Sequence, residues 1–339
     1  MTDRLYLPRR SVLKLMGAGV MSVGLPGAFA NRAMAAMDPV GFQLSWLNSV
    51  QFGGSYLAEA NGYWAAENLE VALTPGGPNA PVEPPVVSGA ALMGISAADY
   101  TAAAVAEGAN FKIIAVAMQK NPFTITSLPD NPVNTPKDLE GKSIGMATAN
   151  TPVLQAVCTL NDVDINQIEI IPTQYDAAPL VNGEVDSLLS WLTDLPVAMT
   201  INGIDNVTML LADYGYTVHS QTYIVLEDSL ADNRDEVIRL MRGELKGWQT
   251  YKEDPAAAAK LTVEMFPDAG LDLPTQELQA AEQVHLMFSP LTDAHGFGWF
   301  TEETVAANIE TLALLGRDVT PDLWDRSVLE EIYDGKSSL

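Results

Sequence analysis

Residues 111–118, Phe-Lys-Ile-Ile-Ala-Val-Ala-Met, form a nearly unbroken apolar run that predicts a strand covered on both faces. Upstream of it, residues 40–46, 69–75 and 91–95 also have the composition of strands. Helices are expected between these strands, over residues 53–61, 84–89 and 100–107. Strands that alternate with helices are typical of a mostly parallel sheet, so the sequence predicts an α/β fold.

Residues typical of turns interrupt this alternation twice, at 127–132 and at 213–216. The alternation continues between the two breaks, and the chain is mostly helical from residue 232 onward. We therefore expect an inserted lobe with two crossovers that serve as hinges, near Ser127 and Tyr216. In this interpretation residues 36–127 and 217–339 form lobe 1, and residues 128–216 form lobe 2.

The amino-terminal 35 residues have the layout of an export signal. Arg9-Arg10 precedes an apolar run over 15–30, and Ala33-Met34-Ala35 offers small residues at a cleavage site. Paired arginines favour the twin-arginine route, and the run is too short and too rich in glycine and proline for a membrane span. We expect residues 1–35 to be a twin-arginine signal peptide and the mature protein to be periplasmic.

The amino-acid composition disfavours some classes of binding partner. The formal net charge is −25, and loss of the basic leader would make it more negative. So acidic a chain lacks the basic stripe that nucleic acid or an anionic membrane requires, and the charge is best explained by solubility. Removal of the leader would leave roughly 300 residues, more than one core usually supports, which agrees with two lobes.

The sequence gives little support to catalysis. Cys158 is the sole cysteine, lies in an apolar run and is expected to be a core residue. His219, His285 and His295 lie far apart without metal-ligand spacing, and Ser55 lacks the elbow pattern of serine hydrolases. We expect no enzyme activity, no metal and no cofactor.

Several short motifs occur in a fixed order along the chain. The first is Gln51–Ala58 followed by Asn61–Trp64, and the most discriminating one is Tyr175–Leu180 with Gly183–Asp186 and Trp191–Pro196. In this order and spacing they resemble the solute-binding proteins of ABC importers in the taurine, nitrate and thiamine-precursor branch. The last segment is similar to a Thr-Asn-x-Pro element of the thiamine-pyrimidine-synthase-like subgroup, although Asp194 stands where that subgroup has asparagine.

The resemblance covers about residues 40–320 and implies a periplasmic-binding-protein fold of two α/β lobes, which close on a ligand by a hinge. It also implies that the protein is a monomeric receptor that delivers a small molecule to an ABC importer permease in the inner membrane. A sensor that presents its ligand to a membrane receptor is an alternative that the sequence does not separate.

The candidate ligand-binding residues stand at predicted strand ends or beside them, where open α/β sheets bind ligands. Aromatic side chains among them can stack on a ring or serve as core, and Asp194 can accept hydrogen bonds from an amine or a protonated ring nitrogen. The candidates are Trp46, Asn48, Gln51, Phe52, Tyr56, Ser96, Asp99, Gln119, Tyr175, Trp191, Thr193, Asp194 and Tyr214.

The ligand class depends on basic residues. Lys120 is the only cation in these candidate segments, whereas acidic and aromatic side chains are frequent. A neutral or cationic heteroaromatic ring, such as a thiamine-precursor pyrimidine or a similar vitamin-like ring, therefore fits better than an anion. Taurine, an alkanesulfonate or nitrate remains an alternative, because backbone amides at helix N-termini can also hold an anion.

Overall fold

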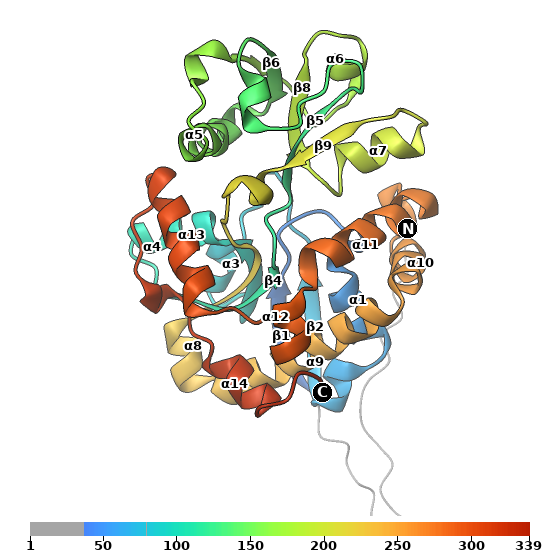
Figure 1. Cartoon of the computed structure of the whole chain (residues 1–339). Coiled ribbons are helices and arrows are strands. Elements are labelled where there is room, and N and C mark those ends of the chain that lie inside the picture. The colour runs from blue at the N-terminus through green and yellow to red at the C-terminus, as the bar shows by residue number, and fades with distance from the viewer. Residues whose placement is uncertain (1–36, 79) are drawn as a thin grey trace, which may run out of the picture. The chain divides into compact units, whose positions relative to one another are not determined.

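The computed structural model describes residues 37–78 and 80–339, so the expected signal peptide lies outside the described residues. Two five-stranded sheets organise these residues, and helices cover both of them (Figure 1).

The first sheet has the strand order β2-β1-β3-β10-β4. β1 pairs in parallel with β2 and β3, whereas β10 is antiparallel to both β3 and β4. Every side chain of β4 except Lys112 is buried, as its apolar run predicts for a strand covered on both faces. The strands are β1 (Asp38–Gln43), β2 (Leu69–Thr74), β3 (Met93–Ala97), β4 (Phe111–Met118) and β10 (Ser220–Leu226).

The second sheet repeats this plan with the order β7-β6-β8-β5-β9. β6 pairs in parallel with β7 and β8, and β5 is antiparallel to β8 and β9. The antiparallel strand of each sheet thus stands in fourth place and comes directly after a connection from the other sheet. The strands are β5 (Phe123–Ser127), β6 (Ser143–Met146), β7 (Glu169–Pro172), β8 (Ser187–Trp191) and β9 (Val207–Leu210).

The connections between the sheets determine which edges lie close together. Residues 119–122 lead from the carboxyl end of β4 to the start of β5, and residues 211–219 lead from the carboxyl end of β9 to the start of β10. Ser220 pairs with Ala97 and Met118, and Phe123 pairs with Trp191, so each antiparallel strand begins at the carboxyl edge of its sheet. Short connections can join these points only if the carboxyl edges of the two sheets approach one another.

The change of sheet comes earlier than the expected change of lobe after residue 127. Residues 123–127 form β5, which pairs with β8 and β9 and not with the first sheet. The expected break at 127–132 marks the end of β5, whereas the connection itself is residues 119–122. The second connection does include Tyr216, the position expected for the other hinge.

Of the helices in residues 37–78 and 80–339, three belong to the second sheet and the others to the first. Those of the second sheet are α5 (Thr151–Leu160), α6 (Ala178–Val181) and α7 (Leu195–Ile201). Those of the first are α1 (Gly53–Ala60), α2 (Tyr63–Ala66), α3 (Glu83–Val87), α4 (Ala98–Ala106), α8 (Glu227–Asp232), α9 (Arg234–Glu253), α10 (Pro255–Met265), α11 (Leu273–Met287), α12 (Pro290–His295), α13 (Glu302–Leu314) and α14 (Ser327–Tyr333).

Short 3-10 turns complete the connections at Val50–Phe52, Pro136–Leu139, Thr148–Asn150, Ile165–Gln167, Leu211–Tyr214, Pro267–Ala269 and Pro321–Leu323. Among the helices of residues 37–78 and 80–339, none has the length and apolarity needed to cross a membrane.

Two pairs of helices connect the lobes in addition to the chain itself. α11 of the first lobe contacts α7 of the second, and α13 of the first contacts α5 of the second (Figure 1). The connecting segments are also tied to each other, because the buried Asn121 donates hydrogen bonds to the Val218 carbonyl at 2.8 Å and to Ser220 Oγ at 3.0 Å. The two connections therefore form one joined element between the sheets.

Candidate functional site

An exposed aromatic group lies where the carboxyl edges of the two sheets approach. Trp46 follows β1 in the first lobe, Tyr175 follows β7 in the second, and their rings meet edge to face with centroids 6.5 Å apart. Their exposed fractions are 37% and 62%, which is high for large aromatic side chains. The structure thus brings together two candidates that are 129 positions apart in the sequence.

Tyr100, for which the sequence predicts only the start of a helix, lies at the same edge of the first sheet as Trp46. It lies in the first turn of α4, directly after β3, and its exposed fraction is 65%. Partial burial, followed by the nearby charges of Asp99 and Tyr175, raises the pKa of Tyr100. Since β3 pairs in parallel with β1, the start of α4 lies at the same carboxyl edge of the sheet as Trp46. An aromatic residue in the first helical turn after a strand is the signal that would have identified it. We call Trp46, Tyr100 and Tyr175 the aromatic trio.

Asp194 lies at the carboxyl edge of the second sheet, three residues after β8. Its carbonyl accepts the Ala198 amide as α7 begins, but its carboxylate caps no backbone amide of that helix. Although the residue is exposed to solvent, the surrounding protein removes part of the carboxylate's hydration and raises its pKa to about 6. The arrangement leaves a carboxylate free to accept a hydrogen bond from a ligand.

The two other candidates at the end of β8, Trp191 and Thr193, are less accessible. Trp191 is half-buried and packs edge to face on Phe123, with ring centroids 6.2 Å apart. Phe123 makes the same type of contact with Tyr216 of the second connection, also at 6.2 Å. Thr193, two residues after Trp191, is buried. Trp191 therefore packs toward the connections between the lobes.

Three candidates of the first lobe form one packed unit. Phe52 and Tyr56 are fully buried in the core, and the Tyr56 ring lies 4.8 Å from that of Phe266. The Tyr56 hydroxyl donates to Asn48 Oδ1 at 3.1 Å, and burial raises the pKa of Tyr56 well above its ordinary value. This contact anchors the loop that carries Trp46.

Four further candidates already have protein partners. Gln119 donates to the carbonyls of Val116 and Trp299, at 3.0 and 3.2 Å, and Tyr214 donates to the Asn134 carbonyl at 2.7 Å. The buried Ser96 donates to Glu83 at 2.5 Å, and the Gln51 carbonyl accepts from the Gln283 amide at 3.4 Å. Each of these residues is thus held in place by a hydrogen bond of its side chain or of its backbone.

Asp99 introduces charge at the edge of the first sheet. Burial raises its pKa, whereas its own backbone amide, that of Tyr100 and the charge of Arg317 oppose the rise. Arg317 is exposed and forms no ion pair with a described residue, so a cation outside the candidate segments lies near this edge. Lys120, the cation within those segments, pairs with Asp213 at 2.7 Å.

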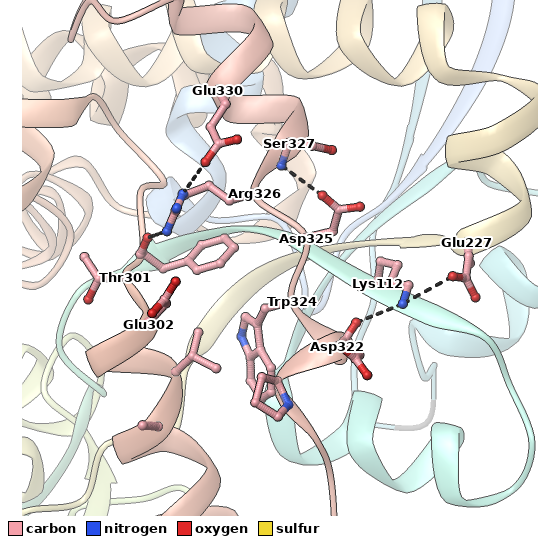
Figure 2. Close-up of a pocket in the computed structure, with 14 residues that line it drawn as sticks. Lys112, Glu227, Thr301, Glu302, Asp322, Trp324, Asp325, Arg326, Ser327 and Glu330 are labelled. Carbon is pink, nitrogen blue, oxygen red and sulfur yellow. Dashed lines mark hydrogen bonds and ion pairs between the residues drawn. The ribbon is translucent and has the colours of Figure 1, made fainter.

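Two pockets of the described residues do not coincide with these candidates. A cavity of about 850 Å³ is formed around Trp324 at the opposite end of the first sheet, where Lys112 approaches Glu227 at 3.3 Å and Arg326 donates to Glu330 at 2.9 Å (Figure 2). A smaller cavity of about 280 Å³ lies beside β7, around Thr173. None of the thirteen candidate residues lines either cavity.

Comparisons with known proteins agree on the type of fold. The periplasmic aliphatic sulphonate binding protein SsuA from Escherichia coli superposes with a TM-score of 0.64 at 14% identity, covering 83% of this chain and 87% of that one. The desulfurization enzyme DSZB superposes with a TM-score of 0.60 at 14% identity, covering 88% of this chain and 99% of that one. The chain therefore has the two-lobed periplasmic-binding-protein fold, which carries binding in one of these proteins and catalysis in the other.

Two characterised relatives are similar over most of their length. The riboflavin-binding protein RibY of Chloroflexus aurantiacus is 24% identical over 279 residues, 80% of this chain and 79% of that protein. The formylaminopyrimidine-binding protein of Halalkalibacterium halodurans is 20% identical over 268 residues, which are 77% of this chain and 80% of that protein. The model of the NMT1/THI5-like family matches residues 49–258, more than half of the chain. The chain belongs to the NMT1/THI5-like family.

Proposed function

We propose that the protein is an extracytoplasmic receptor that binds a small heteroaromatic solute between its lobes and delivers it to an ABC importer. The observation that carries the proposal is the aromatic trio, which gathers exposed rings from both lobes where the sheet edges meet. Rings in this arrangement can stack on a flat ligand from two sides as the lobes close. Relatives named for riboflavin and formylaminopyrimidine binding support a ring-containing solute.

The polar groups support the same ligand class. Asp194 offers a carboxylate without a helix-capping partner, and Lys120 is occupied by Asp213 at 2.7 Å. A carboxylate attracts amino groups or protonated ring nitrogens and repels anions. We therefore place the hydrogen-bond donors of the solute toward the second lobe and its ring against the aromatic trio.

A second candidate is an anion such as taurine, an alkanesulfonate or nitrate. Arg317 favours it, because this exposed guanidinium lies near Asp99 and has no ion-pair partner among the described residues. Under this alternative Arg317→Gln would abolish anion binding, because the main charge-assisted contact would be lost.

A binding screen of the purified protein tests both candidates. The protein is unfolded and refolded to release any carried ligand, and is then titrated with riboflavin, aminopyrimidines, thiamine, taurine, alkanesulfonates and nitrate. A ligand at 100 times its dissociation constant adds about 2.7 kcal/mol to the free energy of unfolding. That gain raises the melting temperature by several degrees, at roughly 2–4 °C per kcal/mol.

Tyr175→Ala tests the site itself. Because one aromatic contact contributes roughly 0.5–1.5 kcal/mol, we expect the affinity for the ring ligand to fall about two- to tenfold. Val181→Ala is the matched control, since Val181 is an exposed apolar residue of the same lobe on α6. Binding of only taurine or nitrate, with no effect of Tyr175→Ala, would contradict the aromatic site and favour the anion.

A further inference from the structure

Gln221 has a backbone conformation that its residue type disfavours. Its φ is 47°, in the left-handed region, and it lies in the irregularity of β10 between Ser220 and Thr222. A residue with a Cβ is strained at such a φ, and glycine would form the same bulge without that strain. Strained residues of this kind occur preferentially at functional sites.

The side chain of Gln221 adds a second unfavourable feature. Its exposed fraction is 2%, and its Oε1 accepts no hydrogen bond from any described residue. Its Nε2 has one distant partner, the Gln51 carbonyl at 3.5 Å. A buried acceptor without a donor lowers stability, so neither the backbone nor the amide of Gln221 is explained by packing.

Gln221 lies at the carboxyl edge of the first sheet. The neighbouring Ser220 pairs with Ala97 and Met118, the last residues of β3 and β4. The contact with Gln51 shows that the amide extends from β10 toward the loop after β1, although β3 stands between these two strands. The side chain therefore runs along the edge where the proposed solute binds.

The loop that Gln221 touches is held by other residues. The Val50 amide donates to Gln276 Oε1 at 2.8 Å, and Gln283 Nε2 contacts the carbonyls of Val50 and Gln51, both at 3.4 Å. Both glutamines belong to α11. With these contacts in place, the long bond from Gln221 is not required to fix the loop.

We propose that Gln221 is a ligand-binding residue whose Oε1 accepts a hydrogen bond from an N–H group of the bound solute. The inference rests on the proposed function and assigns one determinant of its specificity. Oε1 is buried where the two lobes approach, so the solute reaches it when the lobes separate. A solute without the N–H group leaves the buried acceptor without a donor, so the site discriminates against it.

The test compares riboflavin with riboflavin methylated at its imide nitrogen, which removes one N–H donor and keeps the ring. We expect the protein to bind riboflavin about tenfold more tightly than the methylated compound. In Gln221→Gly the affinity for riboflavin should fall about tenfold and the preference should disappear, while the melting temperature stays equal or rises because strain is relieved. A merely structural role would lower stability and affinity together.

Two further variants keep the test decisive. Gln221→Asn keeps the amide group but shortens the side chain by one methylene. Because asparagine tolerates a positive φ, this variant should fold and still lose the preference for riboflavin over the methylated compound. Asp334→Gly is the matched control, because Asp334 has the same φ of 47° at the end of α14 and should leave affinity unchanged.

The outcomes separate the inference from the proposed function. A Gln221→Gly protein that folds and binds riboflavin with unchanged affinity and preference would overturn the role of Gln221 and leave the receptor function standing. A wild-type protein that binds no ring compound of the screen would overturn the proposed function and this inference with it.

Discussion

Asp194 shows how one residue links the fold to a measurable property. Asp194 is an exposed residue as a whole, yet burial of its carboxyl group by the surrounding protein raises the pKa to about 6. If the ionised form accepts a hydrogen bond from the solute, ligand affinity should be highest above pH 7 and should fall by up to tenfold per pH unit below about pH 6. Asp194→Asn should bind more weakly at pH 7.5 and lose this pH dependence. Titration calorimetry between pH 5 and 8 measures both effects.

The control for this prediction is Asp205→Asn. Asp205 is also exposed in the second lobe, before β9, and its substitution removes the same charge. We expect that variant to keep the wild-type pH profile. An Asp194→Asn profile that still declines below pH 6 would show that another group controls binding.

At the scale of elements, the sequence predicts strands with a clear apolar pattern better than strands of mixed composition. Residues 111–118 and 187–191 form strands as expected, and the first of them is a long apolar run, which has few alternatives. β5 was not predicted, since its Phe-Thr-Ile-Thr-Ser sequence leads directly into a turn-rich segment. Its pairing partners, β8 and β9, follow some 60 to 80 residues later, so only the tertiary structure could reveal its place.

The sequence predicts which candidates stand at or beside strand ends, but it does not show which of them are exposed. Trp46 and Tyr175 are exposed at the facing edges, whereas Phe52, at the start of α1, and Tyr56, within it, are buried. An apolar side chain on a helix has the same spacing whether it contacts a ligand or the core. The exposure of Tyr100 and the backbone strain of Gln221 are properties of the folded chain, so the sequence does not show them.

The contact between α1 and α9 gives a prediction about stability. Gly54 lies against the Trp248 indole, and a Cβ on Gly247 would overlap the Gly54 carbonyl oxygen, so the two helices touch through their glycines. Gly247→Ala should lower the free energy of unfolding by roughly 1–3 kcal/mol, because a backbone atom cannot yield as a flexible side chain does. Urea unfolding measures the loss. Ala60→Ser, at an exposed position of α1, should change it little.

At the scale of the whole molecule, two buried groups of the first lobe respond to pH in opposite directions. Glu244 is fully buried, and burial raises its pKa to about 7, although Ser55, Tyr223 and Trp248 each donate to its Oε1 at 2.8 Å. His219 is buried in the second connection, and burial lowers its pKa to about 4. Its Nδ1 accepts from Trp324 at 3.2 Å, which requires that nitrogen to be unprotonated.

The signs follow from the number of protons that each state binds. Between about pH 4.5 and 6.5, native Glu244 keeps a proton that the unfolded chain releases, so this group makes stability fall as the pH rises. Native His219 lacks a proton that the unfolded chain binds, so this group makes stability rise over the same range. Because the two slopes have opposite signs, their contributions to the pH dependence of stability largely cancel.

Single substitutions should separate the two contributions. Relative to the wild type, Glu244→Gln should gain stability as the pH rises from 4.5 to 6.5, by up to about 1.4 kcal/mol per pH unit, because only the histidine slope remains. His219→Gln should show the opposite trend with a similar magnitude. Urea unfolding at intervals of half a pH unit measures the free energy of unfolding of each protein. The difference between variant and wild type removes the contribution of surface carboxylates that both proteins share. Parallel curves for wild type and both variants would mean that neither group titrates differently in the native and unfolded chains.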